Sequence, residues 1–133
     1  MPDSARAPHR HATQYTSREA YYEHVLSGKA TSQKDRIMRW FIQVRRPATR
    51  HEALEFFCKF HPPRAQDGGS PIPWQSLGGA IAGMVCRRTG CDHRWPCDAY
   101  LAVDHEGPCP VTRRLSQFLT PIGDRWAQRK LFS

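Results

Sequence analysis

Four cysteines and two histidines crowd into one stretch of the chain, and they are the side chains whose types could do chemistry. The six residues are Cys86, Cys91, His93, Cys97, His105 and Cys109. Thiolate sulfur and imidazole nitrogen are the ligands that tetrahedral zinc takes in structural sites. The stretch contains neither a Cys-x-x-Cys nor a His-x-x-x-His pair, so a zinc site and plain buried or loop cysteines both stay open. If zinc binds, the expected ligands are Cys91, His93 and Cys97 with either Cys86 or Cys109.

The same stretch also supplies the one pair of residues that could act in catalysis. A nucleophile needs a neighbouring base, and Cys97 with His93 or His105 would be that pair. No pattern in the sequence indicates a third group that would activate the thiol. The chain has no Walker loop, dinucleotide fingerprint or His-Glu-x-x-His motif. We therefore expect a protein that acts by binding and is not an enzyme, with a thiol or zinc enzyme as the weaker alternative.

The charge of the chain indicates what it binds. Its 133 residues include 20 Lys and Arg against 12 Asp and Glu, for a net charge of +8. A balance of this kind favours a polyanion such as nucleic acid over an acidic small molecule, although a basic surface that only aids solubility is the alternative. Five cysteines, an odd number, indicate free thiols or metal ligands in a reducing compartment. No apolar run is long enough for a membrane span and residues 1–4 are polar, so we expect a cytoplasmic protein without membrane contact.

Three helices are predicted by the same starting signal, a hydroxyl residue followed three positions later by an acid. These capping boxes are Thr16-x-x-Glu19, Ser32-x-x-Asp35 and Thr49-x-x-Glu52. Apolar residues at helical spacing then predict helices over about 17–26, 33–45 and 50–57. Residues 1–14 lack large apolar side chains and are expected to form a flexible basic tail. The single domain would therefore run over residues 15–133.

The second half of the domain is predicted to hold one more helix and a hairpin. After a turn-rich stretch over 59–70 that looks too polar to pack, a fourth helix is expected from about 71–74 to about Arg88. One face of it is small, with Ser76, Gly79 and Gly83. Glycine destabilises a helix interior, so this face implies a close approach by DNA backbone or by another helix. Two strands are expected over 100–103 and 115–119, joined by a long tip, and a Cys/His-rich insertion is expected around 86–109. The fold class is mainly α with a small β-hairpin (α+β).

The order helix, helix, short helix, turn, helix and hairpin is that of a winged helix-turn-helix domain. The run from Thr16 to Tyr21, followed by the helix that starts with Thr49 to Ala53, resembles the small winged helix proteins of phages and prophages. The run from Phe118 to Gly123 resembles the last wing strand of MarR-like regulators. This resemblance covers roughly residues 16–124. It implies a DNA-binding protein that controls transcription or replication.

In a helix-turn-helix the second helix of the unit enters the major groove and its first polar residues meet base edges. Gln75 can pair with adenine, Ser76 can contact several bases, and wing arginines can reach phosphates or the minor groove. An ordinary first helical turn and a solvated charged face are the alternatives for these residues. The resemblance also implies double-stranded DNA as the partner and a homodimer on it, with a protein-protein adaptor or a zinc-stabilised binding module as the alternative function. The expected DNA-contacting residues are Arg50, His51, Trp74, Gln75, Ser76, Gly79, Arg87, Arg88, Arg113 and Arg114.

Overall fold

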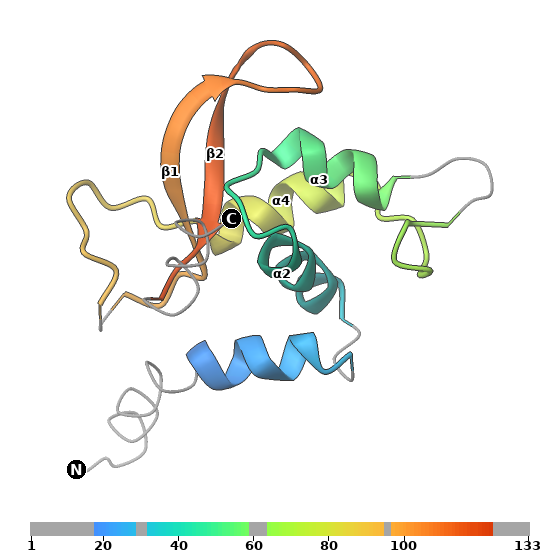
Figure 1. Ribbon diagram of the computed structural model, residues 1–133, viewed down its shortest axis with the longest axis horizontal. Helices are drawn as coiled ribbons and strands as arrows, with labels where there is room; N and C mark the ends of the chain where they lie inside the picture. Colours follow the sequence, from blue (N-terminus) through green and yellow to red (C-terminus); the bar gives the residue numbers. More distant parts are fainter. Residues whose placement is uncertain (1–17, 29–31, 59–63, 95–96, 124–133) are drawn as a thin grey trace.

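A computed structural model describes residues 18–28, 32–58, 64–94 and 97–123 of the chain. Within these ranges four helical segments come first and a two-stranded antiparallel hairpin comes last (Figure 1). The expected α+β class, mainly helical with a small hairpin, is therefore confirmed. The predicted tail over 1–14 and the C-terminal segment after residue 123 lie outside the described residues.

The first three helices begin and end close to where their local signals place them. A helix covers residues 18–26 and is followed by Gly28, which has the left-handed φ of 81° that favours glycine after a helix. Helix α2 (Gln33–Gln43) begins at the Ser32 capping box, and α3 (Arg50–Phe57) begins at the Thr49 capping box. The cap residue Thr16 lies outside the described residues. Helix α2 ends two residues earlier than predicted, before Arg45 takes a φ of 58°.

Helix α4 (Trp74–Met84) is shorter than the sequence predicts. Its backbone becomes extended at Val85, which forms a parallel bridge with Leu101. The N–H of Cys86 then donates to the carbonyl of Leu101 at 2.8 Å. These bonds to the hairpin replace the helical bonds that would have carried the helix on to residue 88. Arg87 and Arg88 therefore lie in a loop after the helix and not in its last turn.

The hairpin is longer than predicted, and its tip is correspondingly shorter. Strand β1 (Leu101–Pro108) pairs with β2 (Leu115–Pro121), with an irregularity in register between Val103 and His105. A two-stranded sheet has only edge strands, where a proline can be accommodated, so β1 continues as far as Pro108, beyond the predicted end at residue 103. Because β1 takes up residues 101–108, the Cys/His-rich segment that precedes it covers 86–100 and not 86–109.

The core lies where the helices meet the base of the hairpin (Figure 1). Its fully buried members come from the four helical segments and from β1, and they include Ile37 of α2, Phe57 of α3, Leu77 of α4 and Leu101 of β1. Just before α3, Ala48 exchanges two backbone hydrogen bonds with Leu119 of β2, at 3.0 and 2.8 Å. This bridge holds the N-terminus of α3 beside the hairpin, which matters for the site described below.

The described part of the loop before α4, residues 64–70, packs against the domain, contrary to the expectation from its polarity. Ala65 is buried, and Arg36 of α2 donates to both carboxylate oxygens of Asp67, at 2.7 and 2.8 Å. The hydrogen bonds from Arg36 hold the pKa of Asp67 below its usual value. A bidentate ion pair thus attaches this loop to α2, a contact that apolar side chains would make in a larger core.

Thr49 is a testable anchor of the fold, because its fully buried hydroxyl has two partners. It accepts from the N–H of Glu52 at 3.2 Å and lies 3.1 Å from the thiol sulfur of Cys109 in the hairpin tip. Thr49→Ala is expected to lower the free energy of unfolding by about 1–3 kcal/mol, measured by urea denaturation. Thr49→Ser keeps the hydroxyl and is expected to lose clearly less. Equal losses in the two variants would show that the hydroxyl contributes nothing.

Candidate metal centre and basic groove

Four residues of the Cys/His-rich segment come together after α4. Each of Cys86, Cys91, His93 and Cys97 can offer one ligand atom, and these atoms all lie within 4.8 Å of one another. Cys97 is buried, and the other three residues are half-buried. The cluster is therefore shielded on one side and reachable on the other, and it is close enough to hold a metal ion.

Two ligand-atom spacings in the cluster are compatible with a tetrahedral zinc site. The Sγ atoms of Cys86 and Cys97 lie 3.8 Å apart, and Sγ of Cys97 lies 4.0 Å from Nδ1 of His93. A tetrahedron with Zn–S bonds of about 2.3 Å has sulfur-sulfur edges of about 3.8 Å. A disulfide would need about 2.05 Å, and all the cysteines are free thiols. Three sulfurs and one imidazole make up the Cys₃His ligand set of closed structural zinc sites.

The backbone between the cluster members is bent by two residues with left-handed φ. Gly90 has a φ of 71° and His93 has a φ of 64°. The bend brings the N–H of His93 to 3.3 Å from Sγ of Cys91, and this hydrogen bond lowers the pKa of the Cys91 thiol. A donor of this kind stabilises the thiolate that a metal requires. Burial has the opposite effect on Cys97 and raises the pKa of its thiol.

Arg18 joins the cluster to the N-terminal helix, and nothing in the sequence analysis singled it out. Its side chain is buried, and it donates to the carbonyl of His93 at 3.0 Å and to the carbonyl of Cys97 at 2.5 Å. The guanidinium therefore holds two cluster residues through their backbones. The two residues lie 75 and 79 positions away along the chain, so no local pattern could have indicated the contact.

The other two residues of the Cys/His-rich stretch are engaged elsewhere. Cys109 is fully buried in the hairpin tip, next to the hydroxyl of Thr49, and is not a member of the cluster. His105 stacks on Phe118 with ring centroids 4.5 Å apart, and its Nδ1 lies 2.7 Å from a carboxylate oxygen of Asp104. Of the two alternatives for the fourth ligand, Cys86 is the one that lies beside Cys91, His93 and Cys97.

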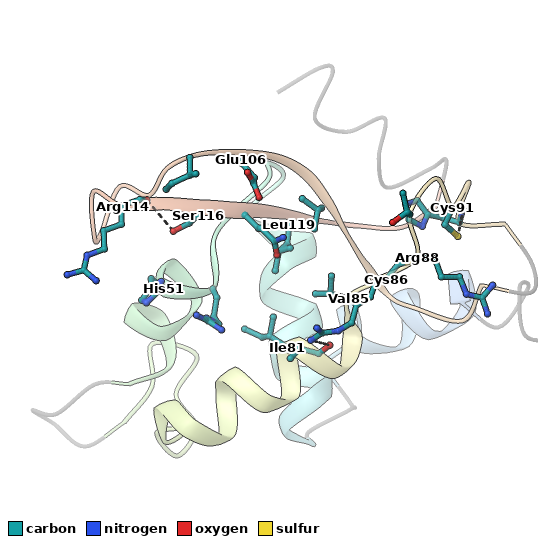
Figure 2. A pocket seen from close by; sticks show the side chains of 18 of the residues that line it. His51, Ile81, Val85, Cys86, Arg88, Cys91, Glu106, Arg114, Ser116 and Leu119 are labelled. Atoms are coloured by element: carbon teal, nitrogen blue, oxygen red, sulfur yellow. Dashed lines mark hydrogen bonds between the residues drawn. The ribbon is translucent and has the colours of Figure 1, made fainter.

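A groove of about 1090 Å³ runs between the hairpin, the start of α3 and the end of α4 (Figure 2). Besides His93 of the cluster, five basic residues line it, and Glu106 is the acidic lining residue among those described. The basic residues come from three separate segments: the start of α3, the loop after α4 and the hairpin. They are Arg50, His51, Arg87, Arg88 and Arg114. Cys86, Cys91 and His93 line the same groove, so the metal cluster forms part of its wall.

The predicted residues at the start of α4 are exposed but do not line this groove. Trp74 is 65% exposed, and Gln75, Ser76 and Gly79 are exposed as well. On a helix, positions 75, 79 and 82 follow one another along one face, and Ala82 does line the groove. Gln75 and Gly79 therefore lie on the face of α4 that leads into it. Arg113 is exposed at the hairpin tip, with a φ of 66°, and is not a lining residue.

The glycines of α4 face open space among the described residues. A side-chain carbon placed on Gly78, Gly79 or Gly83 would meet no atom within 4 Å beyond the helix itself and adjoining residues. The close approach that such glycines imply is therefore not made by another described element of the chain.

No described helix is both long enough and apolar enough to cross a membrane. Comparison of the chain with protein-family models, with curated proteins and with solved structures gave no match. The functional interpretation therefore depends on the geometry of the cluster and the groove.

Proposed function

We propose that this chain binds double-stranded DNA through the basic groove and the adjoining exposed face of α4. The observation that carries the proposal is the convergence of Arg50, His51, Arg87, Arg88 and Arg114 on one groove from three segments of the chain. Charges that only aid solubility have no reason to gather in this way. Guanidinium groups bind phosphate oxygens in a two-point geometry, and a row of phosphates is the polyanion that such a groove fits.

The order of the elements supports a winged helix interpretation of the same surface. Helices α2, α3 and α4 are followed by the hairpin (Figure 1), whose residues line the groove as those of a wing would. In this interpretation α4 is the recognition helix, and Gln75 on its exposed face reads a base edge while the arginines bind the backbone. The open glycines of α4 would then let the helix backbone approach the DNA closely.

The salt dependence of binding tests the proposal. Fluorescence anisotropy with a labelled random duplex is expected to show affinity falling steeply between 50 and 200 mM salt, by about 10³-fold if six groups neutralise phosphates. Arg50→Ala and Arg114→Ala are each expected to weaken binding and to make the slope of log K against log salt shallower by about one.

Arg64→Ala is the matched control for this experiment. Arg64 is exposed in the loop before α4 and is not a lining residue of the groove. Its removal changes the net charge as much as the removal of Arg50 does, so it is expected to leave the slope unchanged if the groove is the site. Binding that ignores salt, or equal effects of all three variants, would contradict the proposal.

We further propose that Cys86, Cys91, His93 and Cys97 bind zinc and that this zinc has a structural role. The support is the ligand set, which leaves no open position for a water or substrate, and the sulfur spacing expected of a zinc tetrahedron. When bound, zinc would supply a cross-link between the end of α4 and the segment before β1. The segment that zinc cross-links would then form one wall of the groove, and its residues would have no catalytic role.

A protein-protein adaptor is the second candidate, because of the open small-residue face of α4 beside exposed Trp74. A partner helix could approach Gly79 and Gly83 closely and cover the indole. The DNA experiment separates the two functions. An adaptor is expected to bind DNA weakly, and Gln75→Ala combined with Arg87→Ala would then leave that weak binding unchanged.

A further inference from the structure

The metal cluster and the basic groove share residues, so the cluster can affect the shape of the groove. Cys86 and Cys91 belong to the cluster and also line the groove. Arg87 and Arg88 lie between these two cysteines in the chain and line the same groove. In Figure 2 the labelled side chains of Cys86, Arg88 and Cys91 lie together at one end of the groove. A metal held by the two cysteines would therefore close a short loop that carries two of the five basic groove residues.

Among the described backbone hydrogen bonds, one ties the start of this segment to the hairpin and another closes a turn within the segment near its end. The N–H of Cys86 donates to Leu101, and the N–H of Cys97 donates to the carbonyl of Arg94. Between them, Arg87 and Arg88 are exposed, and Arg87 makes one long contact, 3.3 Å, from its guanidinium to the carbonyl of Ala82. Besides the local hydrogen bond from the N–H of Arg94 to the carboxylate of Asp92, the described groups that can hold the loop in shape are the cluster side chains and the hydrogen bonds from Arg18.

The main hydrophobic cluster of the domain, which runs from Tyr22 to Leu119, contains none of the four cluster residues, although Cys97 is itself buried. The arginines at the other end of the groove also have their own supports. Arg50 is the first residue of α3, which is held by the Thr49 cap, and Arg114 is part of the hairpin. Loss of the metal is therefore expected to release the loop and leave the rest of the groove in place.

We infer that metal binding at Cys86, Cys91, His93 and Cys97 sets the positions of Arg87 and Arg88 in the basic groove, so that DNA affinity depends on the metal. This inference rests on the proposed function. Without the metal, the loop that carries the two arginines samples many positions, and ordering it on DNA costs conformational entropy. In the metal-bound protein the loop is already ordered, so DNA binding does not bear this cost. The cluster then acts as a positioning device for DNA contacts.

The test compares zinc-loaded and chelator-treated full-length protein, both kept under a phosphine reductant, by anisotropy with a labelled random duplex. Chelation is expected to weaken binding about 10- to 100-fold near 100 mM salt and to make the salt slope shallower by about two, one for each arginine. Adding zinc back is expected to restore both values. In Arg87→Ala/Arg88→Ala the zinc-loaded protein is expected to bind as weakly as the chelated parent, and chelation is expected to have no further effect.

Arg50→Ala/Arg114→Ala is the matched control, because it removes two groove arginines outside the loop. It is expected to weaken binding yet keep the full response to chelation. Equal affinity with and without zinc, or an undiminished response in Arg87→Ala/Arg88→Ala, would overturn the inference while leaving DNA binding established. Loss of the helical circular dichroism on chelation would also overturn it, because the response would then be general unfolding. If the zinc-loaded protein shows no salt-dependent binding at all, the proposed function itself is wrong.

Discussion

Cys97→Ser is expected to remove zinc from the protein. Cys97 is the buried member of the cluster, and its Sγ lies within about 4 Å of ligand atoms of both Cys86 and His93, so it has a central position among the ligands. Structural zinc sites have binding free energies of roughly 10–16 kcal/mol, or about 3 kcal/mol for each of four ligands. Removing one ligand is therefore expected to lower the zinc affinity by more than about 100-fold. A serine hydroxyl cannot replace a thiolate as a ligand at neutral pH.

The measurement is the zinc content of protein purified under reducing conditions and dialysed against a weak chelator. The parent chain is expected to keep about one equivalent, and Cys97→Ser is expected to keep less than a tenth. Cys109→Ser is the matched control, because Cys109 is also buried but lies beside Thr49 and outside the cluster. It is expected to keep the full equivalent. Less than a tenth of an equivalent in the parent chain would refute the zinc site.

Arg18→Met is expected to weaken both the metal site and the attachment of the N-terminal helix. Methionine fills much of the same buried space but leaves the carbonyls of His93 and Cys97 without their charged donors. A hydrogen bond to a charged group contributes about 1.5–3 kcal/mol, so the free energy of unfolding should fall by about 2–4 kcal/mol. Zinc affinity should fall by about 10- to 100-fold, as it does when residues that orient metal ligands are lost.

Competition with a chromophoric chelator measures the zinc affinity, and urea denaturation measures the stability. Arg18→Lys is the informative second variant, because lysine keeps the charge but cannot reach two carbonyls with one planar group. It is expected to fall between the parent and Arg18→Met in both measurements. If stability falls in Arg18→Met but zinc affinity does not, Arg18 only packs the helix and does not position the metal ligands.

The local parts of the fold could be predicted because their causes lie within a few residues. Ser32 with Asp35 and Thr49 with Glu52 cap their helices with the reciprocal hydrogen bonds that the spacing predicts. The end of α4 could not be predicted in this way. Its cause is the pairing of Val85 and Cys86 with Leu101, a residue that is distant in the sequence. The sequence places Arg87 and Arg88 on a helix, whereas the tertiary contact places them in a loop.

The candidate site likewise contains residues that the sequence predicts and residues that only the tertiary structure identifies. Residue type alone singled out Cys86, Cys91, His93 and Cys97, because few side chains bind zinc, but it could not separate Cys86 from Cys109 as the fourth ligand. That choice depends on where the hairpin carries Cys109, which is beside Thr49. Arg18 gave no signal, because a lone arginine at the start of a helix looks like any solvated charge until its distant partners are known.

Sequence by itself determined the helix starts, the mainly helical class with a hairpin, the excess of basic charge and the residues able to bind a metal. These properties depend on side-chain chemistry and on contacts that span a turn or two. Only the tertiary structure decided that the metal cluster adjoins the basic groove and that the arginines from α3, the loop after α4 and the hairpin line it together. The reason is that this proximity arises from long-range packing between α3, α4 and the hairpin. The spacing of residues along the chain does not predict such packing.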